Sequence, residues 1–323
     1  MAQGFAGSRL GYYERIPEFG PNAASGQQSR IWGTESLAQF FEAECGLTPQ
    51  DVGYAPWLET VILRDKDEGG VKRDIDYTDT KETRQMRENL AVINEALAGY
   101  HLSQLGEDGQ VSDLPPFRLR RIFSRGSFGL GGRFFGGPWI NMKPEGRARL
   151  LIDGEETVEL DYSALHPRLI YALDGIPLED GEDPYRIPGW EGPERRQYAK
   201  TAFLQLINSE PGKRIRKPSD IPMEEVGKGQ WPKLIRAFKE KHAKVSHWFR
   251  SGRGLELQRI DSDMAERVML EMLGQGVCCL PIHDSFLVPV SKADQLSDAM
   301  QGAFSSAVRR VSSTFEDVTS PIE

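Results

Sequence analysis

The chain has 323 residues and a net charge of −8 at pH 7, with 39% hydrophobic and 27% charged residues. That composition belongs to a folded soluble protein with one large domain or two, and no run reaches the roughly 20 apolar residues of a membrane-spanning helix. Three cysteines, two of them adjacent (Cys278 and Cys279), argue against a disulfide framework. Because the first residues show no basic-then-apolar leader pattern, we expect a cytoplasmic protein without a membrane partner.

The acidic total hides an uneven distribution of charge along the chain. Residues 118–149 hold eight arginines and lysines against a single acidic residue, whereas acidic residues crowd positions 174–183. The net charge argues against bulk nonspecific binding of nucleic acid. The asymmetry nevertheless indicates a basic stripe on an otherwise acidic body.

The N-terminal third divides into two parts by composition. Residues 1–32 are rich in Gly, Ser, Asn and Gln and have few apolar anchors, so we expect a flexible arm. Residues 33–110 are predicted to be mainly helical, with the clearest helix at 79–100. Asn94 lies beside the apolar face of that helix, where we expect it to satisfy a neighbouring backbone group. The packing face itself comprises Met86, Leu90, Ile93 and Leu97.

Residues 111–150 combine glycines, arginines and aromatic side chains. Glycines allow close approach of a backbone, arginines bind phosphates in a bidentate manner, and aromatic rings stack on bases. The combination favours a nucleic-acid or triphosphate channel, and the alternative is a β-hairpin with a solvated basic face. The aromatic side chains that either stack on bases or pack inside are Phe128, Phe134, Phe135 and Trp139.

Residues 157–171 predict a strand followed by a helix, with a carboxylate between them. Val158 and Leu160 alternate with polar neighbours, as in a half-buried strand. Asp161 stands at the end of that strand, where a side chain faces a crevice, and Ser163 is the expected N-cap of the helix. The apolar face of the helix is predicted to contain Leu165, Leu169, Ile170 and Leu173.

Residues 179–255 contain turns and two basic helices. On the first helix Arg196, Lys200 and Leu204 are spaced four residues apart, so they share one face. A cationic face of this kind suits a triphosphate, and the alternative is a surface helix with two solvated cations. A second basic, amphipathic helix is expected at 233–250.

The last part of the chain predicts a helix at 254–274, a hairpin at 276–289 and a final helix at about 293–311. The hairpin places Asp284 at its tip, because the polar His-Asp-Ser triplet separates two apolar runs. Asp161 and Asp284 would share a pair of Mg²⁺ ions if their strands are neighbours. For either aspartate alone, a capping or turn role is the alternative.

Three segments, in this order, resemble the motifs of one polymerase family. Asp161-Tyr-Ser with Arg168 resembles motif A of family A DNA polymerases, the bacterial polymerase I type. Residues 196–208 resemble motif B, the fingers helix, and His283-Asp284 resembles motif C. The His-Asp-Ser form of motif C is similar to that of the single-subunit phage and mitochondrial RNA polymerases. The order and spacing of the motifs fit over roughly residues 120–300.

The resemblance implies an α+β fold: a right-hand polymerase palm built on an antiparallel sheet, with helical fingers and a reduced helical N-terminal subdomain. The implied domains are a flexible arm at 1–32, a thumb-like helical subdomain at 33–120, a first palm part at 121–178, fingers at 179–255 and a second palm part at 256–323.

The resemblance also implies a site. Asp161, Asp284 and the backbone carbonyl of Tyr162 would bind two Mg²⁺ ions, with Mn²⁺ as the alternative. Arg196 and Lys200 would contact the triphosphate, and Lys200 would donate a proton to pyrophosphate. The other implied contacts are Leu204, Asn208 and His166 with the nucleotide, and Arg133, Gln258 and His283 with nucleic acid.

Three positions depart from the family pattern. Asn208-Ser209 stands where the family has Tyr-Gly, and Ser285 replaces a glutamate that is common in the DNA enzymes. His166 occupies the position where DNA enzymes carry a glutamate steric gate and RNA enzymes a small residue. The sugar preference is therefore not carried over from the family.

We expect a template-directed nucleotidyltransferase, most simply a minimal DNA polymerase that acts on a primer-template with nucleoside triphosphates, with an accessory protein as a further partner. A single-subunit RNA polymerase or primase is the first alternative. An inactive palm that binds nucleic acid is the second. A metal-dependent phosphohydrolase would also use paired aspartates, but it has no reason to keep the helix that carries Arg196 and Lys200.

Overall fold

A computed structural model describes the backbone at residues 6–9, 12–15, 24–27, 30–47, 58–178 and 182–319, and the side chains within 34–47, 58–178 and 182–310. The chain divides into two compact units, which comprise residues 1–56 with 216–228 and residues 57–215 with 229–323. Every predicted site residue belongs to the second unit.

The described strands of the first unit form two antiparallel pairs. β1 (Ala6–Arg9) pairs with β4 (Arg30–Gly33), and β2 (Tyr12–Arg15) pairs with β3 (Ala24–Gln27). α1 (Glu35–Cys45) follows and buries none of its side chains. The flexible arm expected at 1–32 is therefore built of strands wherever the structure describes it.

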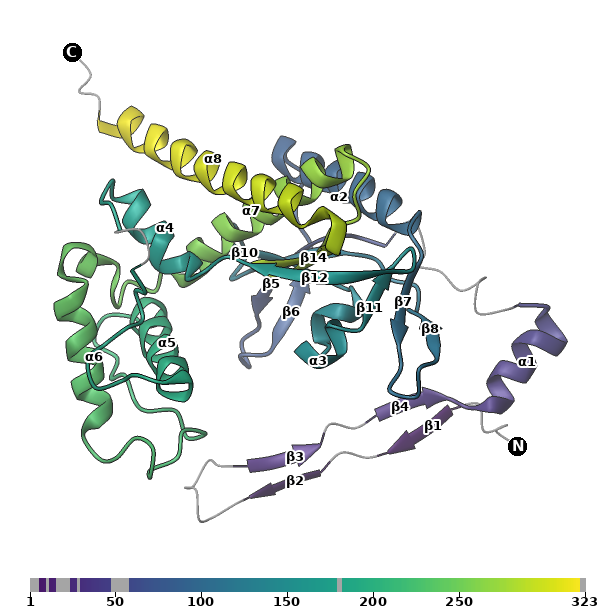
Figure 1. The fold of residues 1–323 in the computed structure, drawn as a ribbon, viewed down its shortest axis with the longest axis horizontal. Coiled ribbons are helices and arrows are strands. Elements are labelled where there is room, and N and C mark those ends of the chain that lie inside the picture. The colour runs from purple at the N-terminus through teal and green to yellow at the C-terminus, as the bar shows by residue number, and fades with distance from the viewer. Residues whose placement is uncertain are drawn as a thin grey trace. The chain divides into compact units, whose positions relative to one another are not determined.

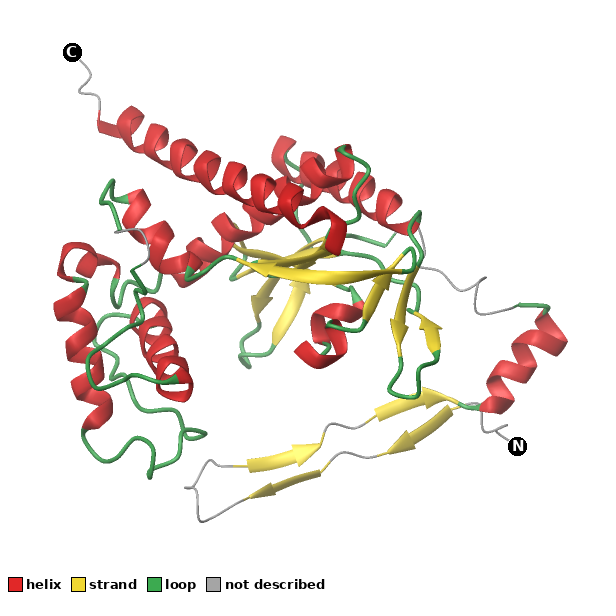
Figure 2. Cartoon of the chain, in the orientation of Figure 1, coloured by secondary structure: helices red, strands yellow, loops and turns green. Residues whose placement is uncertain are grey.

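A six-stranded antiparallel sheet forms the centre of the second unit, in the order β13-β14-β12-β11-β7-β8 (Figures 1 and 2). Two neighbouring inner strands of this sheet, β12 and β14, come from the two segments that the sequence singles out for their aspartates. The strands are β7 (Leu102–Leu105), β8 (Val111–Asp113), β11 (Leu150–Ile152), β12 (Glu155–Asp161), β13 (Leu280–Ile282) and β14 (Ser285–Pro289).

A second, four-stranded sheet has the order β10-β9-β5-β6. Its β5 runs parallel to β9, and its other pairs are antiparallel. The β9–β10 hairpin turns at Arg125 and Gly126, whose φ values of 56° and 62° match the two left-handed positions of a type I′ turn. The strands are β5 (Val61–Lys66), β6 (Lys72–Ile75), β9 (Arg120–Ser124) and β10 (Ser127–Phe135).

Helices α2, α7 and α8 lie together over one face of the sheets, and α3 lies on the opposite side of the six-stranded sheet (Figure 1). α8 packs along α7, and α7 packs on β10. The remaining helices, α4 to α6, gather at one end of the sheet (Figure 1). The α-helices are α2 (Lys81–Ala98), α3 (Pro144–Arg147), α4 (Leu165–Leu173), α5 (Pro193–Asn208), α6 (Gln230–Lys241), α7 (Gly254–Gly274) and α8 (Ala293–Thr319). Short 3-10 helices lie at Pro138–Asn141, Ala243–Trp248 and Val290–Lys292.

The predicted packing faces of two helices are confirmed. Asn94 lies at the edge of the apolar face of α2, where its side chain accepts from the Leu119 N–H (2.7 Å) and donates to the Leu119 carbonyl (2.9 Å). The sequence assigned it this backbone-satisfying role. The predicted apolar residues that are buried are Met86, Leu90, Ile93 and Leu97 on α2 and Leu165, Leu169, Ile170 and Leu173 on α4.

Several predictions of local structure are wrong. The segment 33–110 is not mainly helical, because its described residues from 58 onward contribute β5, β6 and β7 to the two sheets beside α2. Ser163 does not cap α4: the N-cap is Ala164, in a left-handed conformation with φ 54° and ψ 48° and without a side-chain cap. The helix expected at 233–250 ends at Lys241 and continues as a 3-10 helix. The final helix runs past 311 to Thr319.

The expected α+β class is confirmed by these mixed helices and largely antiparallel sheets. Among the residues that the structure describes, none of the helices has the length and apolar character needed to cross a membrane.

Candidate active site

Asp161 and Asp284 lie beside each other at the end of two paired strands. The register of β12 and β14 places Asp161 opposite Ser285, and the Tyr162 N–H donates to the Asp284 carbonyl (3.3 Å). The β13–β14 hairpin turns at His283, with φ 60°, and at Asp284. The two carboxylates that are far apart in the sequence thus meet at one sheet end.

The electrostatics of this pair fit a cation site. Partial burial, together with the negative charge of Asp284, raises the pKa of Asp161 to about 6, and the positive charge of Lys200 opposes that rise. A cation bound between the two carboxylates would offset both the desolvation of Asp161 and its repulsion by Asp284. Carboxylate and carbonyl oxygens are the ligands that Mg²⁺ prefers, and Mg²⁺ commonly uses only one or two carboxylates together with substrate phosphates.

The donor set is small. Across the described residues, no group of three or more Asp, Glu, His or Cys side chains converges as a metal site. The two carboxylates alone would leave most positions around a Mg²⁺ ion to water or to a ligand, and the Tyr162 carbonyl remains a predicted third donor. The side chain of Tyr162 points elsewhere, since its hydroxyl donates to the Met300 carbonyl on α8 (2.6 Å).

Helix α5 presents two cations in different states. The Arg196 guanidinium donates to both oxygens of Asp183 (2.7 and 3.2 Å) and lies 5.5 Å from the centre of the Tyr185 ring. Lys200, one turn later, forms no hydrogen bond or ion pair within the described part of the chain, and its charge acts on Asp161. The predicted helix that carries both cations exists, and of the two only Lys200 lacks a partner among the described residues.

The far end of α5 is engaged in helix packing. Leu204 is half-buried, and the Asn208 side-chain amide donates to its carbonyl (2.9 Å). Asn208 also lies directly against Gly254 at the start of α7, where an added Cβ would stand 1.7 Å from its Oδ1. The nucleotide contacts predicted for Leu204 and Asn208 remain predictions.

Arg133 and His166 converge on a carboxylate that the sequence analysis did not select. Asp261, on α7, has no exposed side-chain surface and accepts from Arg133 (2.5 Å), and its Oδ2 lies 2.9 Å from the His166 ring nitrogen. The signal was present in the sequence, because Asp261 falls four residues after Leu257 and four before Ala265, on the apolar face of the helix. An acid at such a position requires a buried partner.

His283 stands beside this cluster. Its ring lies 5.6 Å from the Phe135 ring, centre to centre, and burial followed by the positive charge of Arg133 lowers its pKa. Its Nδ1 is buried and has no hydrogen-bond partner among the described residues. Gln258 is half-buried on α7. Contacts of His283, Gln258 and Arg133 with nucleic acid remain predictions.

Part of the basic, aromatic segment belongs to the core. Arg121 has no exposed side-chain surface, and it pairs with Asp263 (2.9 Å) and Glu266 (3.2 Å) on α7. Phe134 and Trp139 are buried. The stacking alternative is therefore wrong for these two rings: Phe134 lies on β10, which packs against α7, and Trp139 packs on Phe117 and donates to the Pro281 carbonyl of β13 (2.9 Å).

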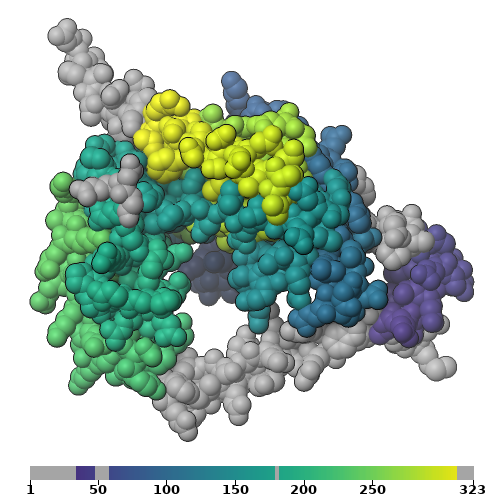
Figure 3. All heavy atoms as spheres, in the orientation of Figure 1, coloured from purple at the N-terminus to yellow at the C-terminus, as the bar shows by residue number. Residues whose placement is uncertain are grey.

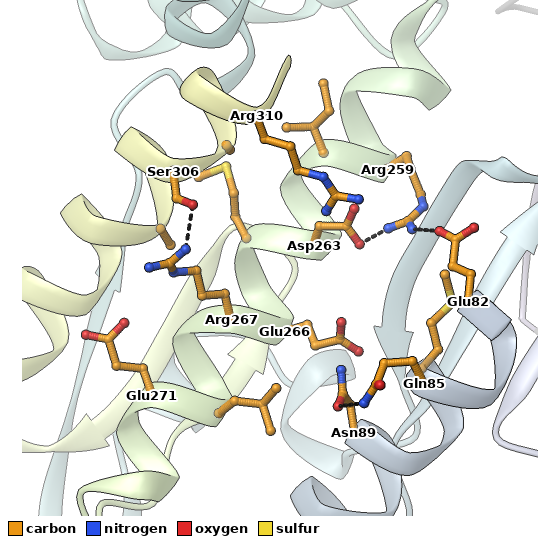
Figure 4. A pocket seen from close by; sticks show the side chains of 16 residues that line it. Glu82, Gln85, Asn89, Arg259, Asp263, Glu266, Arg267, Glu271, Ser306 and Arg310 are labelled. Carbon is orange, nitrogen blue, oxygen red and sulfur yellow. Dashed lines mark hydrogen bonds and ion pairs between the residues drawn. The ribbon is translucent and has the colours of Figure 1, made fainter. Parts of the chain in front are cut away.

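Two hollows lie in different parts of the second unit. The space-filling view is hollowed between the green segment that holds α5 and α6 and the blue and teal segments that hold the sheets (Figure 3). A separate cavity of about 680 Å³ lies between α2, α7 and α8 (Figure 4). Charged side chains in its lining are already engaged: Arg259 pairs with Glu82 (2.8 Å), and Arg267 donates to the Ser306 hydroxyl (2.5 Å). Neither Asp161 nor Asp284 lines this second cavity.

No family model and no curated protein matches the chain. Among solved structures, it is similar to the POL domain of Pol1 from M. smegmatis in complex with DNA primer-template and dNTP, at 13% identity and a TM-score of 0.37. The match covers 70% of this chain and 49% of that one, so this chain spans about half the length of the matched protein. At that level the likeness assigns neither a family nor an activity.

Proposed function

We propose that the chain is a template-directed nucleotidyltransferase that extends a 3′-hydroxyl, most simply a minimal DNA polymerase. One observation carries the proposal: two aspartates share the end of a β-strand pair, and the charge of Lys200, which has no partner among the described residues, acts on Asp161 from the adjoining helix. A phosphohydrolase would need the carboxylates but not a cationic helix facing them. Phosphoryl transfer from a triphosphate uses both, because charge develops on the transferred phosphoryl group and on the leaving group.

Each of the chain's own residues has a definite task in this mechanism. Asp161, Asp284 and the Tyr162 carbonyl would hold Mg²⁺, which supplies Lewis-acid stabilisation of the attacking and leaving oxygens when bound. Lys200 carries a proton at Nζ, and from α5 it can donate that proton to departing pyrophosphate. Arg196 can exchange its exposed partner Asp183 for a phosphate, because guanidinium binds both groups with the same bidentate geometry.

The other side of the site would hold the sugar and the primer end. His166 and Arg133 are fixed there by Asp261, so neither depends on a substrate for its orientation. His166 is neither the carboxylate gate of the DNA enzymes nor the small residue of the RNA enzymes. Synthesis of RNA therefore remains the second candidate, and the sugar must be decided by measurement.

Primer extension tests the proposal. The wild-type protein is offered Mg²⁺ with dNTPs and with NTPs separately, on a DNA template with a DNA primer, an RNA primer or no primer. Templated growth with dNTPs alone supports a DNA polymerase, whereas growth with NTPs or without a primer moves the assignment to an RNA polymerase or primase. Asp284→Asn is the matched control, and it should reduce synthesis by about a thousandfold or more.

The outcomes separate the competing functions. Unchanged synthesis by Asp284→Asn would contradict the role given to Asp284. No incorporation by the wild type under any condition, combined with tight binding of primer-template, would favour an inactive palm that binds nucleic acid. Release of phosphate without chain growth would favour a phosphohydrolase.

A further inference from the structure

A third carboxylate lies on the same face of β12 as Asp161. Glu159 precedes Asp161 by two residues, and side chains two apart on a strand point to the same side of the sheet. No role follows for it from the motifs. Its side chain is 28% exposed, so it is neither a core residue nor a freely solvated one.

Glu159 is held from two directions. Arg147, on α3, donates to both of its oxygens through Nε (2.8 Å) and through a terminal nitrogen (3.1 Å). Arg147 is itself fixed, because it also donates to the Met142 carbonyl (2.8 Å) and is only 14% exposed. A bidentate, charge-assisted pair of this kind defines the position of both groups more narrowly than a single contact.

The second partner connects Glu159 to the aspartate pair. The Ser285 hydroxyl donates to Glu159 Oε1 at 2.7 Å, and its other neighbour, the Ile282 carbonyl, is farther away at 3.2 Å. Ser285 is buried, follows Asp284 directly, and is the cross-strand partner of Asp161. The position of Ser285 therefore affects Asp284 through the peptide bond between them, and it affects Asp161 through the pairing of β14 with β12.

Glu159 does not act as a direct ligand, since no third acidic side chain converges with Asp161 and Asp284 within the described ranges. It fits the role of an outer partner. Such partners orient the ligating groups, and losing one commonly costs 10–100-fold in metal affinity or activity.

We propose that Glu159 is a positioning residue for a divalent-cation site formed by Asp161 and Asp284, acting through Ser285 and held in place by Arg147. The inference rests on the metal site of the proposed function. It adds a residue from β12 to that site, and it explains how a serine after Asp284 contributes although a hydroxyl carries no negative charge.

The test measures metal binding without catalysis. Mn²⁺ is titrated into the full chain, and free Mn²⁺ is followed by electron paramagnetic resonance for the wild type, Glu159→Gln and Glu156→Gln. Glu156 is the matched control, because it is exposed and lies on the opposite face of the same strand. We expect Glu159→Gln to weaken binding by about tenfold and Glu156→Gln to leave it within about twofold of the wild type.

Circular dichroism shows whether Glu159→Gln is folded, and Ser285→Ala is the second test variant if it is not. It removes only the hydroxyl, and it should weaken Mn²⁺ binding by about threefold, the value of one modest hydrogen bond. Unchanged affinity in Glu159→Gln, or in Ser285→Ala where the first variant unfolds, would overturn the inference. A wild type that binds no Mn²⁺ would overturn it as well.

Failure of the proposed function looks different. A chain that binds Mn²⁺ through Asp284 and weakens on Glu159→Gln, but extends no primer, would keep the positioning role of Glu159 and lose the polymerase activity. A chain that extends primers with equal Mg²⁺ dependence in the wild type and in Glu159→Gln would keep the polymerase activity and lose the positioning role of Glu159.

Discussion

The β9–β10 hairpin and helix α5 both carry cations next to aromatic residues, but only the hairpin buries its cations against acidic partners. On the hairpin, the Arg121 side chain has no exposed surface and that of Arg133 is 19% exposed, and both pair with acids of α7. On α5, Arg196 is 47% exposed and bound to a surface acid, while Lys200 has no partner in the described residues.

The difference teaches that a basic stretch acquires its role from the acids that pack against it. α7 places Asp261, Asp263 and Glu266 within two turns, opposite the hairpin. Buried charges require such partners, because isolated burial of an ion costs many kcal/mol. The described part of α7 offers no such acid to Lys200, so its charge stays available to a substrate.

Loss of Arg121 would test the hairpin side with the largest effect. Arg121→Met removes one partner of a buried network and leaves Asp263 and Glu266 without it. We expect the free energy of unfolding to fall by about 3–5 kcal/mol, as when one member of a buried ion pair is deleted. Urea unfolding followed by circular dichroism measures it.

The neighbouring Arg120 supplies the control for that experiment. It is exposed on the same strand, so Arg120→Met should change the unfolding free energy by no more than about 0.5 kcal/mol. Equal effects of the two substitutions would show that the hairpin cations are not distinguished by burial.

The buried face of α5 gives a pH-dependent effect of the next size. The Phe203 ring lies 5.2 Å from the ring of His242, which is fully buried. Burial lowers the pKa of His242 to about 4. Its Nε2 lies 3.0 Å from the Pro184 carbonyl and therefore carries the proton, so Nδ1 accepts from the Tyr171 hydroxyl (2.8 Å).

Because only the unfolded chain takes up this proton between pH 6.5 and 4, the stability due to neutral His242 is present above pH 6.5 and is lost as the pH falls to 4. The loss is roughly 3 kcal/mol. The difference in unfolding free energy between wild type and His242→Gln, measured by urea unfolding at each pH, should shrink across that window. A constant difference would contradict the depressed pKa.

The face of α5 that carries the half-buried Lys200 should govern activity and leave stability alone. Lys200→Met removes the proton donor and the cation acting on Asp161, so kcat should fall by about a hundredfold. The unfolding free energy should stay within about 0.5 kcal/mol of the wild type. Single-turnover primer extension and urea unfolding measure the two quantities.

Arg195 is the control for Lys200, since it is an exposed cation of the same helix that bonds to the Gly189 carbonyl (2.9 Å). Arg195→Met should leave kcat within about twofold. If Lys200→Met loses stability and keeps its activity, α5 belongs with the hairpin and the comparison fails.

Much of this site follows from local patterns in the sequence. The strand before Asp161, the hairpin with Asp284 at its turn and the shared face of Arg196 and Lys200 all depend on periodicity or on residues close in sequence. The structure retains each of them.

The parts that local patterns missed depend on tertiary contacts. The burial of Arg121 and the convergence of Arg133 on Asp261 follow from how α7 packs on β10, across more than a hundred residues of chain. The strands at 58–113 were missed for a similar reason, since short exposed strands such as β6 and β8 are formed by pairing with neighbours and carry little apolar pattern of their own.

The smallest predicted effect concerns the Arg196–Asp183 pair, because Arg196 has an acidic partner, as the hairpin arginines do, but is exposed. Arg196 is bound to Asp183, but the pair is exposed, and exposed ion pairs contribute about 0–1 kcal/mol. Asp183→Asn should release Arg196 for a phosphate and lower the KM for the nucleotide by about two- to threefold, with kcat unchanged. Arg196→Gln should raise KM instead. Opposite signs in steady-state primer extension would place Arg196 with Lys200 on a substrate-facing surface. A rise in KM for both variants would mean that Asp183 orients Arg196 for binding, as Asp261 orients Arg133 on the hairpin side.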